Sequence, residues 1–384
     1  MKKTGPLLLL CVLCFSRLFA QTDDYSLTEQ RKTVLFLIPF FSDKIEEISL
    51  VNARTDDDIY DITPFQLVAF WEGARLAIDE FEQENKPLKV IVRDVSNDST
   101  ELLNILNDSE FMQEVDLIVG PFFGQMFKIA ARYAKQYEIP ILNPFSSKTL
   151  FLNHNEFAYK LMPSAQVEPS LAYRYVKNQD LPMSIMLWVE DETDTEIIPY
   201  IEYFKRENIP YMVVKFENGV SNLTSRFKQG YLHLVIVAAK NKARVISNFR
   251  QLSARADIPK LTLVIPEDWL QKNEEELDIF NRLTVHFFSN YYVDYQNDIT
   301  LNFVNNYIEK YASPPSLARF SFQGYDITRY FLQALFHRFD LRRVQFVPVA
   351  LNFDFHPVEE GGYENKCKRF LRVENFEIKE TVIK

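Results

Sequence analysis

The segment DLIVGPFFGQMFKIAARYAKQYEIPILNPFSS, residues 116–147, decides the fold that the sequence predicts. Two short apolar runs, residues 116–119 and 139–142, flank a stretch that we interpret as a helix. Each run is followed by a proline, Pro121 in the first case and Pro144 in the second. The order strand, helix, strand favours two parallel strands joined by a crossover helix.

The same alternation of strand and helix extends through most of the chain. Strands are expected at residues 33–40, 88–95, 183–189, 209–216, 233–239, 261–265 and 284–291, and helices at residues 65–84, 99–112, 171–177, 195–207, 222–229, 241–254, 299–311 and 319–339. Ser99 and Thr100 are the candidate caps of the helix at 99–112. The alternation breaks at residues 160–170 and then restarts, which indicates two α/β lobes with parallel sheets. The last segment, residues 348–382, has alternating strand character.

Composition bounds the class of protein. The chain has 384 residues, of which 47% are hydrophobic, so it can bury the cores of two domains. It contains only 9 glycines, which disfavours phosphate sites that depend on glycine-rich loops. Its 33 phenylalanines indicate cores and clefts rich in aromatic rings.

The N-terminus has the pattern of a secretory signal peptide. Lys2 and Lys3 precede an apolar run at residues 7–15, and the small residue Ala20 ends the segment. We expect cleavage between Ala20 and Gln21 and an exported mature chain. A run of this length is too short to cross a bilayer, which takes about 20 apolar residues. No other segment resembles a membrane span.

Cleavage would leave an acidic chain with one cysteine. Removing residues 1–20 takes three of the 43 basic residues and no acidic one, which leaves 40 against 53 and a net charge of −13. That balance argues against a nucleic acid or an anionic membrane as a partner. Only Cys367 would remain, so no intrachain disulfide could form. Export without disulfides favours a bacterial periplasm.

The sequence contains none of the common catalytic or cofactor motifs. It has no GxGxxG, GxxxxGK or GxSxG segment, and its five histidines are scattered, without an HExxH pair or a Cys/His cluster. We therefore expect no catalysis, no cofactor and no metal site. The acidic segments 55–61 and 274–276 are interpreted as solvated surface. Residues 55–61 do not follow the spacing of an EF-hand.

Five parts of the chain, taken in order, resemble a known family. They are FWEGARLAIDEFEQEN (70–85), VDLIVGPFFG with IPILNPFSS (115–124 and 139–147), VIPED (264–268), the stretch from FVNNYIEKY to RYFLQAL (303–335) and ALNFDF (350–355). They resemble the type I periplasmic solute-binding proteins, in particular the leucine/isoleucine/valine-binding group. The resemblance implies two α/β lobes that are joined by three crossovers and close on a ligand. Lobe 1 would comprise residues 30–162 and 291–350, and lobe 2 residues 163–290 and 351–384.

The resemblance places ligand contacts in the loops after the two proline-ended strands. The matched residues are Gly124 and Gln125 in the first loop and Phe145, Ser146 and Ser147 in the second. Gly124 would let the backbone approach a ligand, and a helix that begins there would point N–H groups at an anion. The alternative is that Gly124 only relieves a turn. The two serines would either bind a carboxylate or cap the next turn.

In lobe 2 the resemblance matches Glu267 to an acid that binds a ligand ammonium group, with a surface carboxylate as the alternative reading. A tyrosine expected after VIVAAK is absent, and Asn241 and Lys242 stand there instead. That departure argues against an ordinary α-amino acid as the ligand. We keep Asn241 as a candidate contact. Tyr291, at the second crossover, is expected either to line the cleft or to pack.

Aromatic residues also follow the two proline-ended strands. Phe122, Phe123 and Phe145 would form either a stacking surface for an apolar or ring-containing ligand or part of the core. Tyr325 and Asp326 are expected to begin a helix and fix the lobe, without touching the ligand.

The sequence thus predicts an exported bacterial ligand-binding protein that closes its interlobe cleft on a small molecule, for ABC transport or sensing. The ligand would be amino-acid-like, an amide or an aromatic compound. An inner-membrane permease or an envelope protein would be the further partner. The alternative is an envelope interaction or scaffold protein whose solute-binding cleft has degenerated. An exported enzyme has little support in the sequence.

Overall fold

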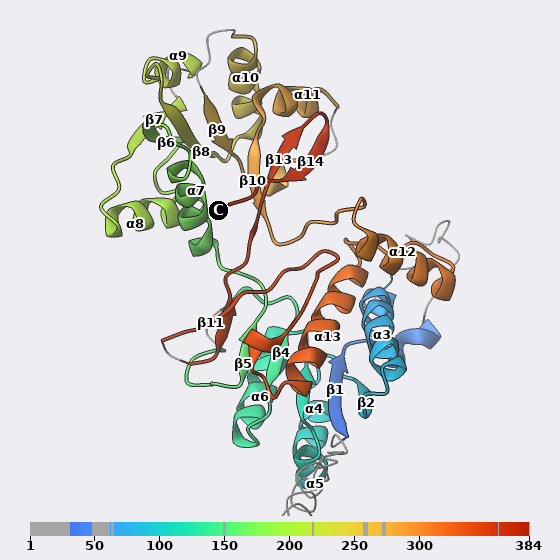
Figure 1. The fold of residues 1–384 in the computed structure, drawn as a ribbon. Helices are drawn as coiled ribbons and strands as arrows, with labels where there is room; N and C mark the ends of the chain where they lie inside the picture. The colour runs from blue at the N-terminus through green and yellow to red at the C-terminus, as the bar shows by residue number, and fades with distance from the viewer. Residues whose placement is uncertain are drawn as a thin grey trace, which may run out of the picture.

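The computed structural model describes residues 31–47, 62, 65–148, 151–216, 219–255, 260–270, 274–359 and 361–383. These residues form two lobes, each built on one seven-stranded sheet (Figure 1). The expected signal peptide at 1–20 and the acidic loop at 55–61 lie outside the described residues. None of the described helices combines the length and the apolar character needed to cross a bilayer.

The sheet of lobe 1 has the strand order β11-β12-β5-β4-β3-β1-β2. Its strands are β1 Lys32–Ile38, β2 Leu88–Asp94, β3 Leu117–Val119, β4 Ile141–Asn143, β5 Ala158–Lys160, β11 Phe355–Pro357 and β12 Tyr363–Asn365. β1 to β5 and β12 all run parallel, and only β11, which pairs with β12, is antiparallel. The sheet is therefore mixed but mostly parallel.

Helices cover both faces of this sheet. They are α3 Val68–Gln83, α4 Ser99–Leu106, α5 Ser109–Gln113, α6 Gly124–Gln136, α12 Asp298–Tyr311 and α13 Ser321–Phe336, with the short 3-10 helices η1 Ser42–Glu47 and η7 Leu341–Arg343. In β1, residues 34–38 are all apolar because both faces of the strand are covered. Val34 and Phe36 pack in one cluster with side chains of α3 and α13, whereas Leu35 and Leu37 pack in another with side chains of α4 and α6.

The sheet of lobe 2 has the order β14-β13-β10-β9-β8-β6-β7. Its strands are β6 Met183–Val189, β7 Met212–Lys215, β8 Leu232–Ala238, β9 Leu261–Val264, β10 His286–Ser289, β13 Arg369–Glu374 and β14 Glu377–Glu380. The helices are α7 Glu168–Lys177, α8 Ile198–Arg206, α9 Gly219–Thr224, α10 Lys242–Ser253 and α11 Glu274–Leu283, with η4 Ala165–Val167 and η6 Glu267–Trp269. β6 to β10 are parallel, and β13 and β14 are antiparallel.

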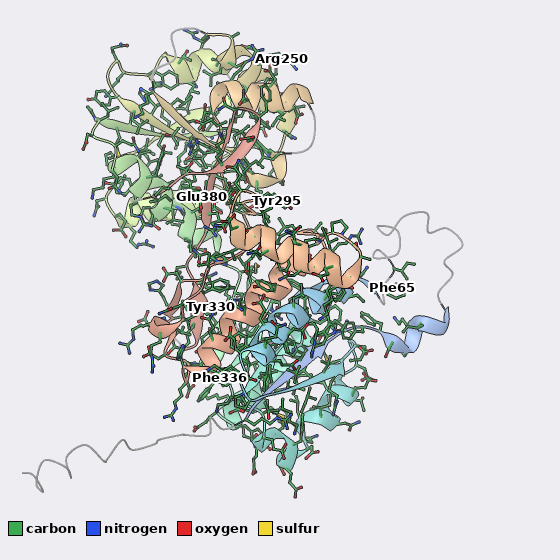
Figure 2. The ribbon with its side chains drawn as sticks, turned by 45° about the vertical axis from the view of Figure 1, so that its right-hand side comes forward. Phe65, Arg250, Tyr295, Tyr330, Phe336 and Glu380 are labelled. Carbon is green, nitrogen blue, oxygen red and sulfur yellow. The ribbon has the colours of Figure 1, made fainter. Side chains whose placement is uncertain are left out.

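Three segments cross between the lobes, and hydrogen bonds hold them to one another and to lobe 1. They follow β5, β10 and β12. The N–H of Tyr292 donates to the carbonyl of Ala350 at 3.0 Å. The side-chain amide of Asn365 donates to the carbonyl of Leu161 at 3.0 Å. Figure 2 shows Tyr295, in the second crossover, and Glu380 close to the junction of the two lobes.

The expected helix at 99–112 is wrong in one respect, because the chain forms two helices there. The Asp108 carboxylate accepts a 3.0 Å hydrogen bond from the N–H of Phe111 and begins α5. Similarly, Asp98 caps α4 by accepting from the N–H of Thr100 at 2.8 Å, where Ser99 and Thr100 were the expected caps. In both places a short acidic side chain competes for backbone N–H groups and sets the helix boundary.

The assignment of residues 351–384 wholly to lobe 2 is also wrong. β11 and β12 belong to the sheet of lobe 1, where Tyr363 pairs with Tyr159 of β5 and the two rings stack 4.9 Å apart. The chain joins the sheet of lobe 2 only with β13. A buried ion pair between Lys160 and Glu364, with Nζ and Oε1 2.6 Å apart, helps to hold β12 beside β5.

Candidate ligand-binding site

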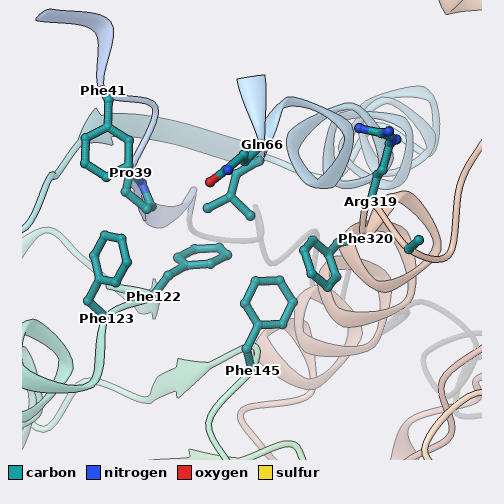
Figure 3. Close-up of a pocket in the computed structure, with 10 residues that line it drawn as sticks. Pro39, Phe41, Gln66, Phe122, Phe123, Phe145, Arg319 and Phe320 are labelled. Carbon is teal, nitrogen blue, oxygen red and sulfur yellow. The ribbon is translucent and has the colours of Figure 1, made fainter. Parts of the chain in front are cut away.

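The first candidate pocket lies in lobe 1 at the carboxyl edge of the sheet and has a volume of about 370 Å³ (Figure 3). It is lined by Pro39, Phe41, Gln66, Leu67, Phe122, Phe123, Phe145, Ala318, Arg319 and Phe320. These residues follow β1, β3 and β4 or precede α3 and α13. Ligands of open α/β sheets bind at such strand ends, so the location favours a binding role.

Five of the ten residues that line the pocket are phenylalanines. Phe145 lies between Phe122, at 5.3 Å and 68°, and Phe320, at 4.3 Å and 41°. Phe41 and Phe123 form a second pair on the other side, with ring centroids 6.0 Å apart. Figure 3 shows these rings converging on one space.

The carboxylate of Asp94, the last residue of β2, holds Phe41 in place. It accepts hydrogen bonds from the N–H groups of Phe40, Phe41 and Ser42 at 2.8, 3.1 and 2.7 Å. Phe41 has a φ of 50°, a left-handed backbone conformation that bulky residues rarely adopt. The three hydrogen bonds oppose the cost of that conformation and keep the ring at the pocket.

Asn143, the last residue of β4, connects the two proline-containing loops. Its side-chain amide donates to the carbonyls of Pro121 and Phe122 at 3.0 and 3.3 Å. Its side-chain oxygen accepts from the N–H groups of Phe145 and Ser146 at 3.0 and 2.8 Å. Asn143 is fully buried, so these bonds also satisfy an amide that would otherwise destabilise the interior.

Two helices meet closely enough to bring a further wall to the pocket. A Cβ atom on Gly73 of α3 would lie 1.9 Å from the carbonyl oxygen of Ser321, and one on Gly324 of α13 would lie 1.9 Å from that of Phe70. Only glycine permits this approach. Phe320, which precedes α13, has a left-handed backbone with a φ of 71° and presents its ring to Phe145.

The second candidate pocket lies in lobe 2 and has a volume of about 210 Å³. It is lined by Ala165, Glu168, Glu196, Tyr200, Ile236, Val237, Val264, Ile265, Pro266, Glu267, Asp268, Phe288 and Lys368. It combines the carboxyl ends of β8 and β9 with the beginnings of α7 and α8. Ala165 and Lys368 come from the first and third crossovers, so the pocket lies on the side of lobe 2 where the crossovers enter.

Carboxyl groups give the second pocket an acidic character. Burial, together with the charges of Asp194, Asp268 and Glu168, raises the pKa of Glu196 to about 7. Burial also raises the pKa of Glu267, against the opposing effects of a hydrogen bond from Ser289 and the charge of Lys368. Lys368 forms an ion pair with Glu168. Among the described residues no three His, Cys, Asp or Glu side chains are placed to hold a metal ion.

The structure brings three of the nine candidate residues to these pockets. Phe122 and Phe145 line the first pocket and Glu267 lines the second. Gly124 and Gln125 lie exposed at the start of α6 and line neither pocket. Their role in binding stays a prediction.

The remaining four candidates have local contacts or lie outside both pockets. The Ser146 hydroxyl accepts from the N–H of Lys148 at 3.2 Å, as a turn cap would. Asn241 caps α10 by accepting from the N–H of Arg244 at 3.1 Å. Tyr291 forms an isolated antiparallel bridge with Leu351, and its hydroxyl donates to the Sδ atom of Met162, in the first crossover, at 3.2 Å. Ser147, like these three, lines neither pocket, and a ligand contact by any of the four stays a prediction.

The expected structural role of Asp326 agrees with its contacts. Its carboxylate is fully buried and accepts from the N–H groups of Val349, Ala350 and Leu351 at 2.9, 2.8 and 2.6 Å. The Tyr325 hydroxyl donates to a carboxylate of α3. Both side chains therefore connect segments of lobe 1.

Sequence reasoning missed several residues that shape the pockets. Phe41 and Phe320 are left-handed residues outside regular strands, and no motif marked them. Asp94 and Asn143 are polar residues at the ends of mostly apolar strands. A polar residue at that position was the signal in the sequence that could have identified them. Tyr200 and Lys368 reach the second pocket from a helix and a crossover, which only the tertiary structure brings together.

No family model matches the chain, and no curated protein matches it. Solved structures do resemble it. A branched-chain amino acid ABC transporter protein from Rhodospirillum rubrum is 15% identical, with a TM-score of 0.62 over 91% of this chain and 100% of that one. A periplasmic ligand-binding protein of a branched-chain amino acid ABC transporter from Burkholderia xenovorans is 10% identical, with a TM-score of 0.52 over 92% and 95%.

An ABC transporter substrate-binding protein from Desulfitobacterium hafniense is 15% identical, with a TM-score of 0.51 over 92% of this chain and 100% of that one. At these identities the likeness concerns the fold. It agrees with the two mixed, mostly parallel sheets and the three crossovers described above. The chain therefore has the two-lobed fold of the type I periplasmic solute-binding proteins.

Proposed function

We propose that this chain is an exported, non-catalytic ligand-binding protein that closes its two lobes on a small molecule for ABC transport or sensing. One observation carries the proposal: each lobe has a pocket at the carboxyl edge of its parallel strands. The crossovers leave β5 and β10 at those same edges. A ligand held by both pockets would therefore stabilise a closed arrangement of the lobes.

The two pockets differ in chemistry, which bears on the ligand. Phenylalanine rings dominate the pocket of lobe 1, whereas carboxyl groups surround the pocket of lobe 2. Glu267, at the end of a strand in the second pocket, is the residue that we propose contacts a donor group of the ligand. The similar proteins from Rhodospirillum rubrum and Burkholderia xenovorans belong to ABC transporters, which supports a membrane permease as the partner.

A thermal-shift screen of the full chain tests the proposal. The panel would contain amino acids, amides, small peptides, nucleosides and aromatic amines. A ligand that binds only the folded state raises the melting temperature. At a concentration 100 times its Kd, it adds about 2.7 kcal/mol to the free energy of unfolding. Glu267→Ala should abolish the shift. Glu309→Ala, on the exposed surface of α12, is the control and should leave the shift intact.

The alternative function is that of an envelope interaction protein with a degenerate cleft. It would be favoured if no compound shifted the melting temperature and a pull-down recovered one envelope protein that still bound the Glu267→Ala variant. In that case the pockets would be remnants of a binding fold.

A further inference from the structure

We propose that the pocket of lobe 1 is a ring subsite that seats a flat aromatic ring of the ligand, and that Asn143 closes its second loop to a carboxylate. The inference rests on the proposed function and names the class of ligand. Asn143 is a positioning residue here, because it acts through the two loops that carry Phe122 and Phe145.

The pocket wall has the geometry that aromatic rings favour. Phe122 and Phe145 of the wall contact one another edge-to-face at 68°. Each also contacts the ring of Phe70, which is buried behind them, at 90° and 77°. Ring edges carry a partial positive charge and ring faces a partial negative one, so a further ring gains contacts that a saturated ring lacks. The volume of about 370 Å³ exceeds the cavity of about 150 Å³ that suffices for benzene, which leaves space for a substituent.

Polar groups are few along this wall. Gln66 and Arg319 are the lining residues with polar side-chain groups, among the residues that the structure describes. Figure 3 shows the guanidinium of Arg319 extending away from the rings of Phe145 and Phe320. The ring subsite therefore has an apolar floor.

Backbone conformation points to the same residues. Phe41 and Phe320 both have left-handed backbones, with φ values of 50° and 71°. Bulky residues are strained in that region, and such strain collects at functional sites. The Asp94 carboxylate, through its bonds to residues 40–42, maintains the first of these conformations.

Asn143 occupies the N–H groups of the second loop that an anion would need as hydrogen-bond donors. A carboxylate bound there would require free N–H groups, but those of Phe145 and Ser146 already donate to the Asn143 side-chain oxygen. A charged oxygen brought to this place would lose water without gaining a partner. The loop therefore favours an uncharged group.

Three matched pairs of compounds test this inference by isothermal titration of the full chain. They are benzamide with cyclohexanecarboxamide, benzylamine with cyclohexylmethylamine, and benzoate with cyclohexanecarboxylate. Within each pair the polar group is the same and only the ring differs. We expect the aromatic member to bind about 3- to 10-fold more tightly. Benzoate should bind most weakly of the three aromatic compounds.

Phe145→Leu tests the subsite itself, because it retains apolar bulk and removes the ring. It should weaken benzamide and benzylamine about 10-fold and abolish the preference over the saturated partners. Phe376→Leu is the matched control, since Phe376 is 58% exposed in lobe 2 and remote from the pocket. It should leave all affinities unchanged. A melting curve of each variant confirms that both are folded.

Equal affinity within the pairs, tightest binding by benzoate, or unchanged binding in Phe145→Leu would each overturn the inference. Failure of all six compounds to bind would overturn it as well. The proposed function has a separate test. If a solute of the thermal-shift panel binds in a manner that depends on Glu267 while the ring compounds do not, the protein is a ligand-binding protein without an aromatic subsite.

Discussion

The side-chain amide of Asn143 donates a hydrogen bond to the carbonyl oxygen of Pro121 at 3.0 Å, and thereby joins the ends of β3 and β4. The two prolines that follow the apolar runs do more than end the strands. They lead into loops that one buried side chain fixes in a common arrangement. Phe122 and Phe145 line the same pocket as a consequence.

Replacing Asn143 by alanine should destabilise the protein strongly. The change leaves two buried carbonyls and two partly buried N–H groups of the loops without their partner. We expect a loss of about 3 kcal/mol in the free energy of unfolding, measured by urea denaturation. Asn305→Ala, on the exposed face of α12, is the control and should change the free energy of unfolding by less than about 0.5 kcal/mol. Equal effects of the two substitutions would contradict the assigned role of Asn143.

The close contact of α3 with α13 predicts opposite outcomes for glycine substitutions. Gly324→Ala would place a Cβ atom 1.9 Å from the Phe70 carbonyl oxygen, so the helices must separate. We expect a loss of about 2–3 kcal/mol in urea denaturation. At Gly124 an added Cβ atom would meet no other atom within 4 Å, and alanine there should be neutral or stabilise by up to about 1 kcal/mol. Comparable losses at both positions would contradict the helix packing.

The buried ion pair between Lys160 and Glu364 predicts a loss of stability when one partner is neutralised. Both side chains are almost inaccessible, at 0% and 3% exposure. Glu364→Gln leaves the ammonium group of Lys160 without its counter-charge and should cost about 3–5 kcal/mol at pH 7. Glu114→Gln is the control, because its ion pair with Lys89 is exposed and should contribute less than about 1 kcal/mol.

The same ion pair predicts that the stability of the protein falls at acidic pH. Burial raises the pKa of Glu364, but hydrogen bonds from Lys160, Lys366 and Ser164 outweigh it and lower the pKa to about 2. Because the pKa is depressed on folding, the stabilisation is complete above the unfolded value of about 4.3 and is lost as the pH falls through about 2. The stability difference between wild type and Glu364→Gln should shrink across that window. A constant difference would show that ionisation of Glu364 is irrelevant.

The burial of His286 predicts a second loss of stability, at a less acidic pH. Burial, and next the charge of Arg372, lower its pKa to about 4. The neutral ring therefore stabilises the fold fully above the unfolded value of about 6.5, and this contribution disappears as the pH falls through about 4. Urea denaturation between pH 7 and pH 4 should show wild type losing about 3 kcal/mol relative to His286→Phe. Parallel profiles would contradict burial of a neutral imidazole.

Much of the fold could be predicted from the sequence because its local signals agree with the tertiary structure. Residues 34–38 of β1 are all apolar, since both faces of the strand are covered. The strands of both lobes mostly alternate with helices in the expected order, but β5, which was not expected, follows β4 without a helix between them. The positions of Phe122 and Phe145 followed from the rule that parallel strands end at the same edge of a sheet. Glu267 was matched through the family resemblance, and it lies just after the end of β9.

What could not be predicted depends on contacts between distant segments. β12 joins lobe 1 because it pairs with β5, about 200 residues earlier in the chain. Nothing in the local sequence of β12 indicates which strand it pairs with. The break between α4 and α5 depends on Asp108, whose side chain competes for a backbone N–H group. Phe320 reaches the pocket only because Gly73 and Gly324 let two helices approach.

The central claim is that a small molecule closes the two lobes, and small-angle X-ray scattering tests it most directly. The full chain would be measured alone and with a saturating concentration of the compound that gives the largest melting shift. We expect a smaller radius of gyration with the compound, and no change in Glu267→Ala. A bound compound, verified by titration, that leaves the radius of gyration of the wild type unchanged would contradict closure of the lobes.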